Sequence, residues 1–285
     1  MYPREFMVAV LNNYGGFYNR ALYVHELQKA GGIVHLPCVN NSDDVVTISG
    51  IDVYLGLVGI HGLEGNFIER IPEERRQNGP YLSLEDLVRR TGLGLEQAVT
   101  LIRVGALRFT GQSKKELLWQ VHRLLDTNVK PVNELSLFNV EAKHYQLPVL
   151  VNTRLEDAYH ELELLGFPLT ISFFDLLETE FRGEIMADDL SNHKGQTVKM
   201  VGRYVDEKTV KTKHGQRMYF GCFLDADGNF FDTTHFPNTT PLYPFRGAGC
   251  YLIEGKVVED FGFPSLEVLK CEKLKILGNP VMELE

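Results

Sequence analysis

Two glycines in the first half of the chain are the residues best suited to bind a phosphate. Gly92-Leu93-Gly94 lies between two stretches whose apolar residues recur at helical spacing. Because glycine has no Cβ, the backbone N–H groups at the start of the second helix can come close to an anion. Arg89, Arg90 and Arg103 add cations on the flanking stretches. We therefore predict a phosphate site at this turn, with a plain helix–helix turn as the alternative.

Ala98, four residues after the second glycine, completes a helix-hairpin-helix pattern, which binds duplex DNA through such a turn. An upstream copy at residues 60–65 has Gly62 in the matching place, but Glu64 stands where its second glycine is expected. A carboxylate there repels phosphate, and Pro72 is expected to kink the next helix, so this copy is predicted to be degenerate. Three arginines behind it are expected to form a basic face: Arg70, Arg75 and Arg76.

The last third of the chain changes from helical to strand periodicity. Five strands are predicted, at residues 197–201, 218–224, 230–236, 251–258 and 266–271. The long connection between the third and fourth strands favours a small Greek-key barrel of the oligonucleotide-binding (OB) type. We therefore predict an α+β multidomain fold, in which a helical helix-hairpin-helix domain precedes a five-stranded OB-type β-barrel.

A basic loop beside aromatic strand residues suits single-stranded nucleic acid, because rings stack on bases at roughly 1–3 kcal/mol each. The candidates are Lys211, Lys213, Arg217, Tyr219, Phe230 and Phe236. For the aromatic residues, core packing is the alternative. Residues 191–285 hold 12 Lys/Arg and 12 Asp/Glu, so we expect DNA binding by the barrel to be modest and sensitive to salt.

A short apolar peptide, ELSLF at 134–138, lies in a strongly acidic stretch after Pro131. Such side chains on a tether usually occupy a pocket elsewhere or on a partner, although packing on their own domain is the alternative. The peptide resembles the Gln-Leu-x-Leu-Phe motif by which bacterial replication proteins bind the sliding clamp. The predicted clamp-binding residues are Glu134, Leu135, Leu137 and Phe138. Glu134 replaces the glutamine and cannot donate its amide hydrogen bonds.

The net charge of −9 is concentrated in one part of the chain. Residues 131–190 hold 3 Lys/Arg against 12 Asp/Glu, whereas residues 61–130 hold 11 against 9. The acidic part repels phosphate, so we expect it to lie away from DNA as a solvated surface. The basic excess instead coincides with the predicted hairpins.

Other chemistries have little support in the sequence. The four cysteines, Cys38, Cys222, Cys250 and Cys271, have no zinc-ligand spacing, and we interpret them as reduced thiols of a cytoplasmic protein. Asp225-Ala226-Asp227-Gly228 is predicted to be a hairpin turn rather than a metal-binding pair. No phosphate loop, signal peptide or membrane span is indicated. We assign no catalytic residue, metal or cofactor.

Taken together and in this order, several stretches resemble the C-terminal part of the bacterial DNA polymerase III alpha subunit. They are YPREFM at 2–7, GLVGIHG at 56–62, GPYLSLEDL at 79–87, LIRVGAL at 101–107, ELELLG at 161–166, Gly202 and TKHG at 212–215. The resemblance extends over essentially the whole chain. No helix-start signal precedes the first helical pattern, so we expect the chain to be part of a longer protein.

The resemblance implies four regions: the end of the fingers at 1–55, a tandem helix-hairpin-helix domain at 56–130, a clamp-binding peptide and acidic linker at 131–190, and an OB domain at 191–285. It implies duplex and template single-stranded DNA, the sliding clamp beta subunit and other replisome subunits as partners, and no membrane. Implied duplex contacts are Gly62, Arg89, Arg90, Gly92, Gly94 and Arg103. Because the family's catalytic palm is not represented, this fragment of a nucleotidyltransferase should not polymerise DNA by itself.

Two other classes of protein remain open from the sequence. A stand-alone OB protein that binds single-stranded nucleic acid would share the barrel, and a preference for single strands over duplexes would distinguish it. An NAD-dependent DNA ligase also combines an OB barrel with helix-hairpin-helix units. Its four-cysteine zinc site is not matched by the scattered cysteines of this chain.

Overall fold

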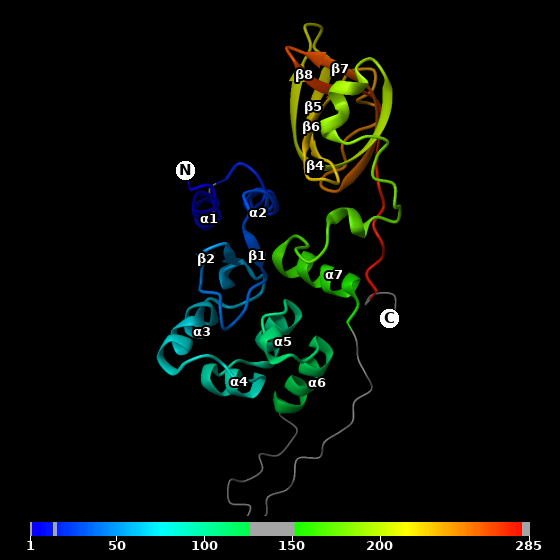
Figure 1. The fold of residues 1–285 in the computed structure, drawn as a ribbon. Helices are drawn as coiled ribbons and strands as arrows, with labels where there is room; N and C mark the ends of the chain where they lie inside the picture. The colour runs from blue at the N-terminus through cyan, green and yellow to red at the C-terminus, as the bar shows by residue number, and fades with distance from the viewer. Residues whose placement is uncertain (1, 14–15, 126–151, 281–285) are drawn as a thin grey trace, which may run out of the picture. The chain divides into compact units, whose positions relative to one another are not determined.

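The computed structural model describes residues 2–13, 16–125 and 152–280 (Figure 1). The chain folds as two compact units. The first comprises Met1–Gly16 and Glu26–Thr170, and the second comprises Phe17–His25 and Ile171–Glu285. The predicted fold class is confirmed, because a helix-hairpin-helix region is followed by a closed five-stranded barrel.

Two helices and a small sheet open the chain. The helices are α1 (Pro3–Asn13) and α2 (Arg20–Lys29), and the strands are β1 (Ile33–His35), β2 (Thr47–Ser49) and β3 (Asp52–Tyr54). The strand order is β1-β3-β2, with β1 parallel and β2 antiparallel to β3. The Asn12 amide anchors α1, since it donates to Val46 O and accepts from Val46 N at 2.9 Å each.

The hairpin region follows as a short 3-10 turn η1 (Leu57–Gly59) and four helices. These are α3 (Gly65–Asn78), α4 (Leu84–Thr91), α5 (Leu95–Arg103) and α6 (Lys114–Leu125), with the 3-10 turn η2 (Arg108–Thr110) before α6. Serines begin two of them: Ser83 accepts from Asp86 N, and Ser113 exchanges hydrogen bonds with Glu116 in a capping box. The helix α3 continues through Pro72 to Asn78.

The apolar faces of these helices are buried. Leu57, Ile71, Leu84, Leu87, Leu101 and Ile102 are at most 1% exposed. The contacting helix pairs are α3 with α4, α4 with α6 and α5 with α6. This packing fixes the positions of the hairpin turns, which connect the helices at the surface.

A seventh helix, α7 (Arg154–Leu165), lies in the acidic part of the chain and packs on α5 (Figure 1). Thr153 and Glu156 form its capping box, and Gly166, with φ of 87°, ends it in the left-handed conformation. This helix is not among the elements predicted from the sequence.

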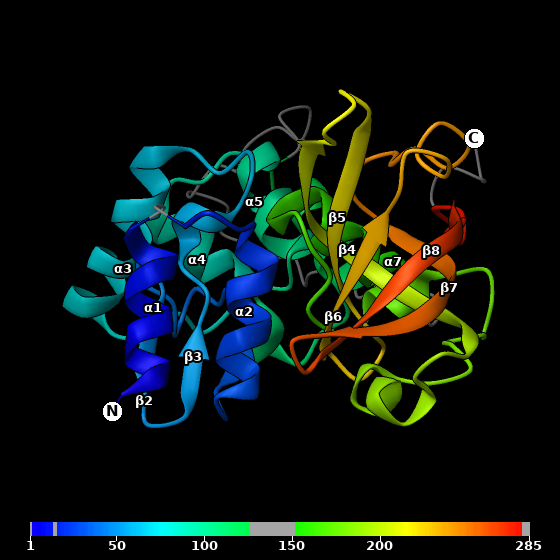
Figure 2. The ribbon, with the colours of Figure 1, turned by 90° about the horizontal axis from the view of Figure 1, so that it is seen from above.

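The second unit contains the barrel. Its strands are β4 (Thr197–Lys211), β5 (Arg217–Leu224), β6 (Phe230–His235), β7 (Cys250–Asp260) and β8 (Phe263–Lys273), preceded by the 3-10 segments η3 (Phe173–Leu176) and η4 (Ala187–His193). The closed order is β4-β5-β6-β8-β7, with β6 and β8 parallel. All five predicted strands are present, and the β4–β5 hairpin projects beyond the rest of the barrel (Figure 2).

The barrel interior is densely filled. Phe223 and Phe231 stack with ring centroids 5.6 Å apart. A Cβ on Gly202 would lie 2.6 Å from the Phe231 ring, so only glycine lets β4 pass this close to the ring. Asp225 begins the predicted turn, in which Gly228 N donates to Asp225 O. Among the residues that the structure describes, no helix is long and apolar enough to cross a membrane.

Candidate nucleic-acid interface

The second hairpin, whose turn is Gly92-Leu93-Gly94, has an open backbone surface. Gly92 ends α4 in the left-handed conformation at φ 71°, and Gly94 caps α5 in an extended conformation without a side-chain hydrogen bond. The intervening Leu93 is 2% exposed and anchors the turn in the core. A Cβ on Gly94 would meet nothing within 4 Å. The first-turn N–H groups of α5 have no acceptor among the residues that the structure describes, so they can donate to a phosphate.

The first hairpin, the upstream copy at residues 60–65, is covered by other parts of the same unit. His61 N donates to Leu164 O of α7 at 2.8 Å, and Glu64 N donates to the buried Gln97 side chain of α5 at 2.9 Å. Gln97 also donates to Gly62 O at 3.1 Å. Two of the turn's N–H groups thus have acceptors within the protein, while the Glu64 carboxylate is exposed beside them. Both features disfavour phosphate at this copy.

The helix α7 pairs with cations on α5 and α6. Arg103 binds Glu163 through both guanidinium ends, and Lys114 Nζ lies 2.7 Å from the Asp157 carboxylate. The Arg103 hydrogen bond and charge lower the pKa of Glu163. Burial, with Arg103 and Lys114 nearby, lowers the pKa of His160 to about 4, so its ring is neutral at neutral pH. Arg103 therefore faces a carboxylate rather than open solvent.

Arg90 holds the helices of the hairpin region together. Its side chain is 12% exposed and lies between the carboxylates of Glu74 and Asp86 at 3.3 and 3.2 Å. It also donates to the carbonyls of Glu74 and Gly79 and lies over the Tyr81 ring, 4.3 Å from its centroid. With so many partners inside the unit, Arg90 acts as a structural cation.

Arg90→Ala is expected to lower the free energy of unfolding by about 2 kcal/mol or more, because Glu74 and Asp86 would lose their shared partner. Denaturant unfolding of the full chain measures this. Arg89→Ala is the matched control: the Arg89 side chain is 79% exposed, and its loss should change stability by less than about 0.5 kcal/mol. Equal stability of the two variants would contradict the structural role of Arg90.

Arg70 is the cation nearest the second hairpin. A Cβ built on Gly92 would lie 3.9 Å from Arg70 Nη1, so the guanidinium extends from α3 to the turn. Arg75 is bound to Asp43 and two carbonyls, and Arg76 lies 3.4 Å from Asp43. Arg70 has no hydrogen bond or ion pair with another residue that the structure describes. It was expected in a basic face behind the first hairpin, and its position beside Gly92 makes it an additional candidate for phosphate contact at the second hairpin.

The predicted basic loop of the barrel forms the tip of the β4–β5 hairpin. Lys211 and Arg217 are directly opposite each other across the two strands, and Lys213 lies in the turn between them. All three are exposed. None forms an ion pair within the described part of the chain, so the tip carries three uncompensated positive charges.

The predicted aromatic residues do not share one face. The Tyr219 ring turns toward the interior, 5.8 Å from the Phe245 ring. Phe230 and Phe236 are 44% and 38% exposed. Phe220, which is not among the predicted residues, is 45% exposed and lies between Lys208 and Thr234 on the neighbouring strands. The outer face of β4, β5 and β6 thus presents the Phe220 and Phe230 rings beside a lysine.

The predicted clamp-binding residues, Glu134, Leu135, Leu137 and Phe138, lie outside the described residues. Their role stays a prediction, as do the duplex and single-strand contacts assigned to individual residues.

The chain is similar to known bacterial DNA polymerases. A helix-hairpin-helix motif model matches residues 31–117. The DNA polymerase III subunit alpha of Borreliella burgdorferi is 28% identical over 304 aligned positions that cover 100% of this chain and 26% of that protein. The subunit of Staphylococcus epidermidis is 26% identical, with the same coverage. An error-prone DNA polymerase of Mycobacterium tuberculosis is 37% identical over 121 positions, 41% of this chain and 11% of that protein.

These matches confirm the predicted resemblance to the C-terminal part of the DNA polymerase III alpha subunit. The chain spans about a quarter of the length of the alpha subunits that it matches, and its aligned part covers about a tenth of the error-prone polymerase. It is therefore similar to one region of a DNA-directed DNA polymerase.

Proposed function

We propose that this chain is a DNA-binding and sliding-clamp-binding region of a replicative DNA polymerase III alpha subunit, without the catalytic palm. The open second hairpin carries the proposal, because its geometry offers unpaired N–H groups and a nearby cation to a phosphate. The end of the fingers at 1–55, the hairpin domain at 56–130, the acidic linker at 131–190 and the OB domain at 191–285 are the parts of this region.

Duplex DNA binds at the second hairpin. The Arg70 guanidinium lies close to Gly92, two residues before the N-cap of α5, so it can add a cation to the same turn. The exposed Arg89 at the C-terminal end of α4 adds a further phosphate contact, although Asp86 competes for it at 2.9 Å. Phosphate contacts of this kind hold the duplex irrespective of base sequence.

Single-stranded DNA binds to the barrel. The cationic tip with Lys211, Lys213 and Arg217 attracts the backbone, while the exposed rings of Phe220 and Phe230 stack with bases. The relatives are DNA polymerases by name, which supports a template strand as the natural ligand of this face.

Titration of the full chain with fluorescent duplex, single strand and purified clamp tests the function. We expect binding to all three, with duplex and single-strand affinities that fall as salt rises. Binding to single strands only would instead favour the stand-alone OB protein. Absence of any DNA binding at low salt would contradict the proposal.

A further inference from the structure

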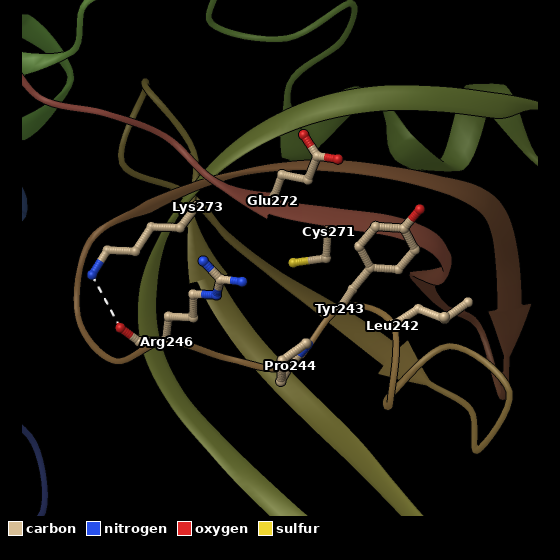
Figure 3. A pocket seen from close by; sticks show the side chains of 7 residues that line it. All are labelled: Leu242, Tyr243, Pro244, Arg246, Cys271, Glu272 and Lys273. Atoms are coloured by element: carbon tan, nitrogen blue, oxygen red, sulfur yellow. Dashed lines mark hydrogen bonds between the residues drawn. The ribbon is translucent and has the colours of Figure 1, made fainter.

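The barrel has a second cationic feature besides the tip of the β4–β5 hairpin, and this one is a hollow. It has a volume of about 310 Å³ and lies between the segment after β6 and the end of β8 (Figure 3). This volume is at the lower end of the range for small-molecule sites, roughly 300–1,000 Å³. The side chains around it are Leu242, Tyr243, Pro244, Arg246, Cys271, Glu272 and Lys273.

The backbone around the hollow is held in place by hydrogen bonds. The Tyr251 hydroxyl accepts from Arg246 N at 2.8 Å and donates to Gly247 O at 2.7 Å. Lys273 Nζ donates to Arg246 O at 3.1 Å. Gly249 makes room for this lysine, because a Cβ there would lie 2.6 Å from Lys273 Cε. Both backbone groups of Arg246 are thus fixed, and the hollow exists before any ligand arrives.

The guanidinium of Arg246 is free to bind a ligand. It points into the hollow in Figure 3, and no ion pair joins it to another residue within the described part of the chain. The carboxylate of Glu272 points away from it. Lys273 adds a second positive charge, and the half-buried Tyr243 ring, packed on the barrel core, forms the opposite wall. A site of two cations and a fixed ring suits a ligand that combines a phosphate with a base.

We propose that this hollow binds one nucleotide of a single DNA strand, with its phosphate between Arg246 and Lys273 and its base against Tyr243. The inference rests on the proposed single-strand function of the barrel and extends it to a second subsite. The Thr240 hydroxyl lies 3.5 Å from Arg217 O. The segment that lines the hollow therefore also contacts the strand β5 where the cationic tip begins. This contact connects the cationic tip with the segment that carries Tyr243 and Arg246.

Arg246→Gln in the full chain removes the charge but leaves the backbone hydrogen bonds of residue 246 intact. We expect the affinity for a short oligothymidylate to fall about three- to tenfold, and the salt slope to fall by about 0.7, as for one lost phosphate contact. Lys256→Gln is the matched control, because Lys256 is exposed on β7 and does not line the hollow. It should leave both quantities nearly unchanged.

A wild-type chain that binds the oligonucleotide, with Arg246→Gln no weaker than Lys256→Gln, would overturn the subsite and leave the proposed function standing. A wild-type chain that binds no oligonucleotide would overturn single-strand binding itself. Amide chemical shifts in NMR provide a second readout. Thymidine monophosphate should shift Tyr243, Arg246 and Lys273 together, and the same shifts with inorganic phosphate alone would reject a nucleotide in favour of a simple anion.

Discussion

Replacing Gly94 with aspartate is expected to reduce duplex affinity at least tenfold while leaving the protein as stable as before. Gly94 occupies the N-cap of α5 at φ −77° and ψ 171°, a conformation that aspartate prefers, and its Cβ position is open. The new carboxylate would accept hydrogen bonds from the first-turn N–H groups and repel a phosphate from the same place. A tenfold loss corresponds to about 1.4 kcal/mol.

Duplex anisotropy titrations and thermal unfolding measure the two effects separately. Gly94→Asn is the matched control, because it occupies the same space and caps the helix without a charge, and it should lose less affinity than aspartate. Glu64→Asp makes a size change without a charge change in the first hairpin and should not alter binding. Full duplex affinity in Gly94→Asp would rule out the second hairpin as the phosphate site.

The parts of the fold that local signals determine were predictable from sequence. Ser83, Ser113 and the glycines of the second hairpin act within a few residues of their own position, so their effect on helix ends depends little on the rest of the chain. The barrel strands were found for the same reason, because alternation and turn residues are local patterns.

The interface depends on long-range contacts that no local pattern reveals. Arg90 was a phosphate candidate because it lies near the hairpin glycines, yet its partner Glu74 is 16 residues earlier. The partner of Arg103 is 60 residues away, on the helix α7 within the acidic part of the chain. Arg89 and Arg90 are adjacent in sequence and differ in exposure, at 79% and 12%, because successive helix residues point about 100° apart.

The strand β5 shows why the aromatic residues could not be assigned. It carries rings in both alternation phases, with Tyr219 and Phe223 in one and Phe220 in the other. Barrel closure turns the first phase inward, where Phe223 is fully buried, and leaves Phe220 exposed. The neighbouring strands that decide this, β4 and β6, are specified by pairing across the barrel rather than by the sequence of β5.

Leu137→Ala combined with Phe138→Ala is expected to abolish measurable clamp binding and leave duplex binding unchanged. Burying each of these side chains in a clamp pocket would contribute roughly 1.5–3 kcal/mol. Ordering of the tether offsets part of this gain, so the intact peptide should bind weakly. Removal of both side chains should therefore leave no measurable binding. The loss is measured as the affinity of the full chain for the sliding clamp from the same organism, in a surface-based binding assay.

Two further variants separate recognition of this peptide from a general effect of the acidic stretch. Ser136→Ala changes the variable position of the motif and should bind the clamp as the unmodified chain does. Glu134→Gln restores the side-chain amide and should bind more tightly, because it adds hydrogen-bond donors and removes a charge. If the double alanine variant binds the clamp with unchanged affinity, the contact lies elsewhere in the chain. Equal weakening by Ser136→Ala would instead show that the leucine and phenylalanine are not the specific anchors.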